Sequence, residues 1–148
     1  MDMEPMPAHG YEIMDHTADK AVRAWSDSLE SLFAILADAM FAIFLDRNSV
    51  APVSTESIEV RAGDLQNLVV RWLSELLYMH EVDGKLILDT QVTEVSEGDD
   101  CCVRATICTA PIDSGETYLG GAVKAVTYHA LRVDHTPTGW EAFVLFDV

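Results

Sequence analysis

Apolar residues recur every three or four positions in two segments of the first half of the chain, a spacing that places them on one face of a helix. The first predicted helix covers residues 28–45, where Asp27 and Glu30 form a D-x-x-E variant of the capping box. The second covers residues 65–81, with Asp64 as its predicted N-cap. The two apolar faces consist of Leu29, Leu32, Phe33, Leu36, Met40, Ile43 and Phe44, and of Leu65, Leu68, Val69, Trp72, Leu73, Leu76 and Leu77.

Elsewhere the chain carries β-rich or alternating runs between sequences that are typical of turns, such as Asp83-Gly84. The predicted strands cover residues 11–14, 20–25, 56–61, 86–89, 91–96, 101–109, 123–133 and 140–146. Because most strands follow the helices, the pattern favours an α+β fold, a two-layer sandwich of two amphipathic helices packed on a largely antiparallel β-sheet. Residues 1–10 are predicted to form a flexible leader and residues 11–148 a single domain.

The charge of the chain bears on its partners. Its 25 acidic residues against 9 basic ones give a formal net charge of -16, while an apolar content of 49% argues against disorder. Phosphate backbones would be repelled, so no direct nucleic-acid binding is expected. The same charge favours a cationic protein partner and would help to recruit a divalent metal. Alternatively, the charge only keeps the protein soluble.

The cysteines indicate a reducing compartment. Cys101, Cys102 and Cys108 are an odd number in one short segment, which is a poor disulfide framework. Cys102 and Cys108 are predicted to share one strand face as buried core thiols, with Cys101 on the other face. The N-terminus has no signal-peptide pattern, and no apolar run reaches the ~18 residues of a membrane span. We therefore expect a cytoplasmic protein without membrane association.

Acidic groups gather in two short segments, Asp15-His16-Thr17-Ala18-Asp19 and Phe146-Asp147-Val148. The α-carboxylate of Val148 would add a further anionic oxygen beside Asp147. We expect these groups to meet in space. Clustered hard oxygens repel one another unless a proton or a divalent cation lies between them, and oxygen-only sets suit Ca²⁺, Mg²⁺ or Mn²⁺ rather than Zn²⁺.

Each of these candidates also has a structural explanation. Asp15 and Asp19 could cap backbone N–H groups in a turn, and His16 could be a hydrogen-bonded structural residue rather than a general base or a metal ligand. Asp64 is adequately explained as an N-cap. Lys124 is either a solvated strand residue or a cation that faces an anion or an acidic cluster. The chain contains no P-loop, G-x-S-x-G, G-x-G-x-x-G or H-E-x-x-H motif, which lowers the expectation of an enzyme.

Six segments in order give the chain a resemblance to the archease family, from about Tyr11 to Val148. They are Asp15-His16-Thr17-Ala18-Asp19, Ser28-Leu29-Glu30-Ser31-Leu32-Phe33, Asp64-Leu65-Gln66-Asn67-Leu68-Val69, Trp72-Leu73-Ser74-Glu75-Leu76-Leu77, Val123-Lys124-Ala125-Val126-Thr127-Tyr128-His129 and Phe146-Asp147-Val148. Lys20 departs from the family pattern, in which an aliphatic residue is usual, and it places a cation beside the predicted site.

The resemblance implies a non-catalytic accessory factor for the RtcB-type RNA ligase of tRNA splicing and RNA repair, one that promotes guanylylation of the ligase and its multiple turnover. It further implies Asp19, Asp147 and Val148 as the metal ligands, for Ca²⁺ or for Mg²⁺ or Mn²⁺.

Four further residues match the family pattern. Asp64 and Lys124 correspond to other positions of functional interest, and Asp15 and His16 would support the site.

Two other classes of function stay open. The first is a small metal-dependent hydrolase that uses the same carboxylates with His16 as base, and it predicts turnover without any ligase. The second is a chaperone or general interaction module, and it predicts metal-independent binding to unfolded clients.

Overall fold

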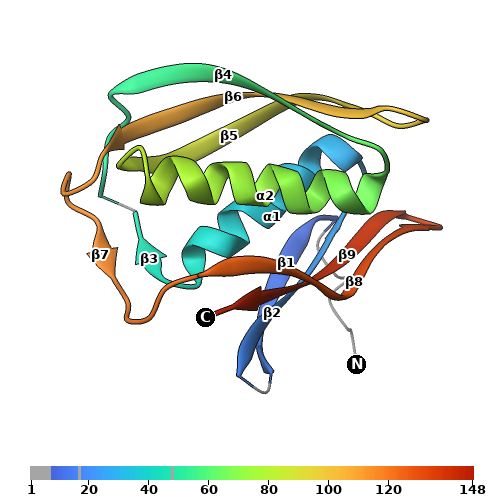
Figure 1. Cartoon of the computed structure of the whole chain (residues 1–148), viewed down its shortest axis with the longest axis horizontal. Coiled ribbons are helices and arrows are strands. Elements are labelled where there is room, and N and C mark those ends of the chain that lie inside the picture. Colours follow the sequence, from blue (N-terminus) through green and yellow to red (C-terminus); the bar gives the residue numbers. More distant parts are fainter. Residues whose placement is uncertain (1–7, 17, 48) are drawn as a thin grey trace, which may run out of the picture.

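Two antiparallel sheets lie on opposite sides of two helices in the computed structural model, which describes residues 8–16, 18–47 and 49–148 (Figure 1). Residues 1–7 of the predicted leader lie outside the described residues. In chain order the elements are β1 (Gly10–His16), β2 (Asp19–Ser26), α1 (Leu29–Ala42), β3 (Leu45–Asp46), β4 (Ser54–Ala62), α2 (Leu65–Glu81), β5 (Lys85–Ser96), β6 (Cys101–Pro111), β7 (Thr117–Tyr118), β8 (Ala125–Thr136) and β9 (Gly139–Asp147).

The strands divide between a four-stranded sheet of order β1-β2-β9-β8, a three-stranded sheet of order β4-β6-β5, and the short pair β3-β7. Each helix contacts both larger sheets: α1 packs on β2 and β5, and α2 packs on β8 and β4 (Figure 1). The predicted α+β class, with two helices packed on antiparallel strands, is confirmed. The strands form separate sheets on the two sides of the helices because α1 is apolar around most of its circumference and buries both sides.

The two helices begin at side-chain caps. The Asp64 carboxylate accepts a 2.8 Å hydrogen bond from Asn67 N–H, which confirms it as the N-cap of α2. For α1 the predicted capping box is wrong, because the Ser28 hydroxyl is the cap and accepts from Ser31 N–H at 3.2 Å. The Glu30 carboxylate instead accepts from Val95 N–H at 3.3 Å, and so ties α1 to β5.

Some element boundaries differ from the prediction. Helix α1 ends at Ala42, and the apolar residues that continue its pattern lead into β3. The predicted strands 86–89 and 91–96 are one strand, β5, whose pairing with β6 contains two register shifts. Strand β8 begins at Ala125, so Lys124 immediately precedes it. No helix among the described residues is long and apolar enough to cross a membrane.

The prediction assigned Cys101 and Cys102 to the wrong faces of β6. Cys101 lies on the core side of β6 with Val103, Ala105 and Ile107, whereas Cys102 is buried on the opposite side. Cys108 is half-buried, and all three thiols are free. Burial raises the pKa of the Cys101 and Cys102 thiols, which makes them poor nucleophiles.

Candidate functional site

Side chains from four strands form one row across the end of the four-stranded sheet. Asp19 of β2 lies directly opposite Asp147 of β9, His16 of β1 lies opposite Asp19, and Ala125 of β8 lies opposite Asp147. Directly opposed residues point to the same face of an antiparallel pair, with Cβ atoms about 4.5–5.5 Å apart. The register therefore places Asp19 and Asp147 on one face of the sheet, with His16 on the other side of Asp19 from Asp147.

The β1–β2 hairpin fixes the position of Asp19. Ala18, in the connection between His16 and Asp19, has a φ of 63°, a left-handed conformation that glycine or asparagine adopts more readily. Thr17, the other residue of the connection, lies outside the described residues. The pairing of β1 with β2 then continues without a break to Gly10. Asp19 is half-buried and Asp147 is exposed, so both carboxylates are accessible from solvent.

Lys124 and Val148 lie beside Asp147. The Lys124 N–H donates a 2.7 Å hydrogen bond to the Asp147 carbonyl, which holds the segment before β8 against the end of β9. The Lys124 side chain is exposed, and none of the ion pairs formed among the described residues involves its ammonium. The Val148 side chain is half-buried against the core.

Asp15 lies on the opposite face of the hairpin from this row. It is paired in register with Lys20, and the two side chains form an ion pair. Since successive side chains alternate between the faces of a strand, the Lys20 ammonium points away from the Asp19 carboxylate. Lys20, the residue that departs from the family pattern, is therefore ion-paired with Asp15 on the other side of the sheet.

Asp64 belongs to a separate polar group at the start of α2. The Asn67 side-chain amide donates to both Asp64 carboxylate oxygens at 3.0 Å, and the Tyr128 hydroxyl donates to Asn67 Oδ1 at 2.9 Å. These bonds connect α2 to β8, three residues along the strand from Ala125. Sequence reasoning missed Asn67 and Tyr128 as partners of Asp64. The D-x-x-N spacing from the N-cap could have indicated Asn67, but nothing local indicates Tyr128.

The donors at the end of the sheet fit a hard cation. Two opposed carboxylates and the backbone oxygens of Val148 are all oxygen ligands, which suit Ca²⁺, Mg²⁺ or Mn²⁺. Among residues 8–16, 18–47 and 49–148, no three His, Cys, Asp or Glu side chains gather so that they could hold a metal ion. The predicted set contains only two such side chains, so its third contribution has to come from the backbone.

Comparison with known proteins gives concordant matches. Residues 11–148 match the Archease protein family (MTH1598/TM1083). The protein archease of Methanopyrus kandleri is 36% identical over 138 residues, covering 93% of this chain and 99% of its own, and that of Methanosarcina mazei is 35% identical over 152 aligned positions, covering 97% and 100%. The matches therefore span nearly the whole length of both relatives.

Solved structures show the same fold. The solution structure of Methanobacterium thermoautotrophicum protein 1598 matches with a TM-score of 0.78 at 29% identity, covering 94% of this chain and 99% of the other. The crystal structure of a Thermotoga maritima archease, described as a possible chaperone, matches with a TM-score of 0.57 at 17% identity over the full length of both chains.

Proposed function

The chain belongs to the archease family, and from that premise we propose that it is a non-catalytic, metal-binding accessory factor of an RtcB-type RNA ligase. In this proposal it promotes guanylylation of the ligase and so supports multiple turnover in tRNA splicing or RNA repair. The observation that carries the proposal is the direct pairing of Asp19 with Asp147 at an accessible end of the sheet. The net charge of -16 is consistent with a factor that contacts a basic, RNA-binding enzyme rather than RNA itself.

The residues of the row have distinct roles in this proposal. Asp19 and Asp147 hold the cation with the Val148 backbone oxygens, and His16 borders it. A bound divalent cation supplies concentrated positive charge at the guanylylation pocket of the ligase. The Lys124 ammonium, which no carboxylate of the described residues engages, extends from the same end of the sheet and is available to a phosphate oxygen of the nucleotide.

The test is multiple-turnover RNA ligation by a cognate RtcB-type ligase with GTP and Mn²⁺, with and without this protein. We expect the wild type to stimulate turnover and Asp19→Ala or Asp147→Ala to abolish the stimulation. Asp15→Ala is the matched control, because it removes a carboxylate from the same hairpin but from the opposite face of the sheet. Equal stimulation by wild type and Asp19→Ala would contradict the proposed role of the site.

Two further measurements separate the other classes of function. Hydrolysis of a phosphoester by the protein alone, lost in His16→Ala, would support the metal-dependent hydrolase. Suppression of the aggregation of an unfolded client in the presence of EDTA would support the chaperone.

A further inference from the structure

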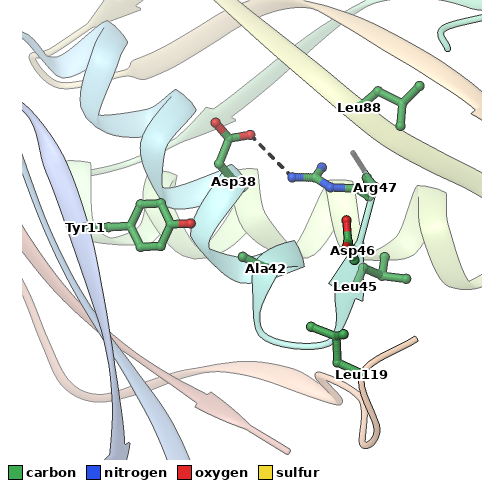
Figure 2. A pocket seen from close by; sticks show the side chains of 8 residues that line it. All are labelled: Tyr11, Asp38, Ala42, Leu45, Asp46, Arg47, Leu88 and Leu119. Atoms are coloured by element: carbon green, nitrogen blue, oxygen red, sulfur yellow. Dashed lines mark ion pairs between the residues drawn. The ribbon is translucent and has the colours of Figure 1, made fainter. Parts of the chain in front are cut away.

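A cavity of about 480 Å³ lies beside β1, between that strand and the β3 and β5 side of the molecule. Figure 2 shows Tyr11 of β1 on one side, Asp38 and Ala42 of α1 behind, and Arg47 with Leu88 of β5 on the other side. Leu119, from the connection between β7 and β8, borders it as well. The lining of the cavity thus mixes apolar side chains with three charged ones, Asp38, Asp46 and Arg47.

The cavity carries a net negative charge, because its lining has two acids, Asp38 and Asp46, against one base, Arg47. The Arg47 guanidinium is largely buried, donates to the Ile87 carbonyl and lies over the Phe41 ring at 5.3 Å, so it is committed to the wall. Its nearest approach to the Asp38 carboxylate is 3.7 Å, and the Asp38 side chain stays 51% exposed. Burial raises the pKa of Asp38, Arg47 opposes that effect, and the neighbouring Asp89 carboxylate adds to it. A second cation has access to Asp38, because the carboxylate is half-exposed and Arg47 is held against the wall.

Strand β1 borders the cavity and offers an open edge. It is the last strand of its sheet, and within the described residues no strand pairs with its other side. Its register with β2 is unbroken over seven residues. Tyr11 and Ile13 face the α1 side, in register with the core residues of β2, yet are 40% and 38% exposed. A long, regular edge with exposed apolar side chains favours the addition of another strand.

The other sheet edges differ from β1. Strand β8, at the far edge of the same sheet, is distorted between Thr127 and Arg132, where Ala130 has a φ of 56°. Strand β5 contains two register shifts, and the exposed side chains of β4 are polar or charged. Distortion and polar side chains are common protections of an edge strand. Of the described edges of the two larger sheets, β1 alone combines regular pairing with exposed apolar residues.

We propose that β1 and this cavity bind an extended segment of a protein partner, which adds to β1 as a strand and places an arginine or lysine side chain beside Asp38. The partner is basic, because the cavity lining has two acids against one base and the whole chain has a net charge of -16. For the same reason a second copy of this chain, which carries the same net charge of -16, is disfavoured at this edge. Alternate side chains of the added strand point toward α1 and enter the cavity. This surface adds to the carboxylate site and does not depend on the function proposed for it.

The probe is a synthetic peptide of alternating valine and arginine, acetyl-Val-Arg-Val-Arg-Val-Arg-Val-amide, matched to the seven residues of β1. Binding to the metal-free protein is followed by NMR, which measures the chemical shifts and the hydrogen exchange of its backbone amides. We expect saturable shifts confined to β1 and to the cavity, with slower exchange at β1 amides. A peptide of the same charge, N-methylated along one edge, should bind at least about tenfold more weakly, since it cannot complete the strand hydrogen bonds.

Variants of the cavity sharpen the test. Asp38→Asn should weaken binding about fivefold and Tyr11→Ala about tenfold. The matched controls are Asp113→Asn and Tyr78→Ala, which alter an exposed acid and an exposed tyrosine away from this edge and should leave binding unchanged. Equal binding of the N-methylated peptide, or equal binding by Asp38→Asn and Tyr11→Ala, would overturn the inference, since either would reduce the interaction to general charge attraction. The assay contains neither ligase nor metal, so its outcome is separate from that of the ligation experiment.

Discussion

The two ends of the β2–β9 strand pair are built differently. At one end, Ser26 lies opposite Trp140, and Gly139 packs directly on the backbone of the residues that lead into α1. At the other end, Asp19 lies opposite Asp147, and two like charges share one accessible face. The first end has a close contact that the fold requires. The second places two acidic residues opposite each other, an arrangement that does not help the fold and is therefore expected of a binding site rather than of a structural contact.

The largest stability effect is expected at the packed end, from Gly139→Ala. A Cβ atom there would lie 2.2 Å from the Ser26 carbonyl oxygen and 2.6 Å from Asp27 Cα, at a φ of 143°. We expect the free energy of unfolding in urea to fall by about 3 kcal/mol or more. Gly121→Ala is the control, because its φ of 70° is also positive but nothing lies within 4 Å of the added atom. The control should cost only about 1 kcal/mol, and equal losses in the two variants would contradict the packing explanation.

The next largest effect concerns the charged end and comes from the metal. If Asp19 and Asp147 hold Ca²⁺, a free concentration about 100 times the Kd should stabilise the folded protein by about 2.7 kcal/mol. For a chain of this length that corresponds to a rise in Tm of about 5–10 °C, measured by calorimetry against EDTA. Asp147→Asn should abolish the rise and Asp15→Asn should retain it. A rise of the same size in Asp147→Asn would place the ion elsewhere.

A smaller effect is expected from the ion pair near the packed end. Arg23 Nε donates to Glu141 at 2.7 Å, with both side chains about one-third exposed, and the Glu141 carboxylate raises the pKa of the Arg23 guanidinium. Because solvent screens the pair, Glu141→Gln should lower the free energy of unfolding by no more than about 1 kcal/mol. The loss should shrink in high salt, and a loss that is insensitive to salt would indicate packing instead of charge.

The smallest effect should have the opposite sign. In EDTA, Asp147→Asn removes the repulsion between directly opposed carboxylates and should raise the free energy of unfolding by about 0.2–1 kcal/mol. Urea unfolding of the wild type and the variant at low ionic strength measures this difference. A clear loss of stability would mean that the Asp147 carboxylate makes a structural contact, and the contrast between the two ends would then fail.

The sequence predicted the parts of the fold that depend on local chemistry. Helix α2 was placed correctly because Asp64 caps its start and the apolar face ends before the turn at Asp83. The predicted end of α1 was too late, because Phe44 and Leu45 continue the helical pattern of apolar residues. In the structure Leu45 begins β3. The exchange of Cys101 and Cys102 has a similar cause, since alternation does not fix which face is inward when both neighbours are apolar.

Long-range contacts lay beyond local patterns. Alternation gives the face of a strand but not its partner, so the division into two sheets could not be deduced from periodicity. The chemistry of acidic groups was the reason to predict that Asp19 and Asp147 meet. The β2–β9 register places them opposite each other. The Tyr128–Asn67 bond depends on the packing of β8 against α2, which no local motif encodes.

The β2–β9 register also limits which sequence changes could persist during the divergence of related chains. Lys20 follows Asp19 and faces the opposite side of the sheet. Consider a residue inserted in β2 after Lys20, with the rest of the strand still paired to its present partners in β9. Lys20 would then lie opposite Asp147 in the place of Asp19, so a base would replace an acid. Inserting a residue in the exposed connection at 97–100 would change no such pair. Lineages should therefore vary freely in the lengths of such connections, whereas β2 and β9 should differ by substitution and keep their length.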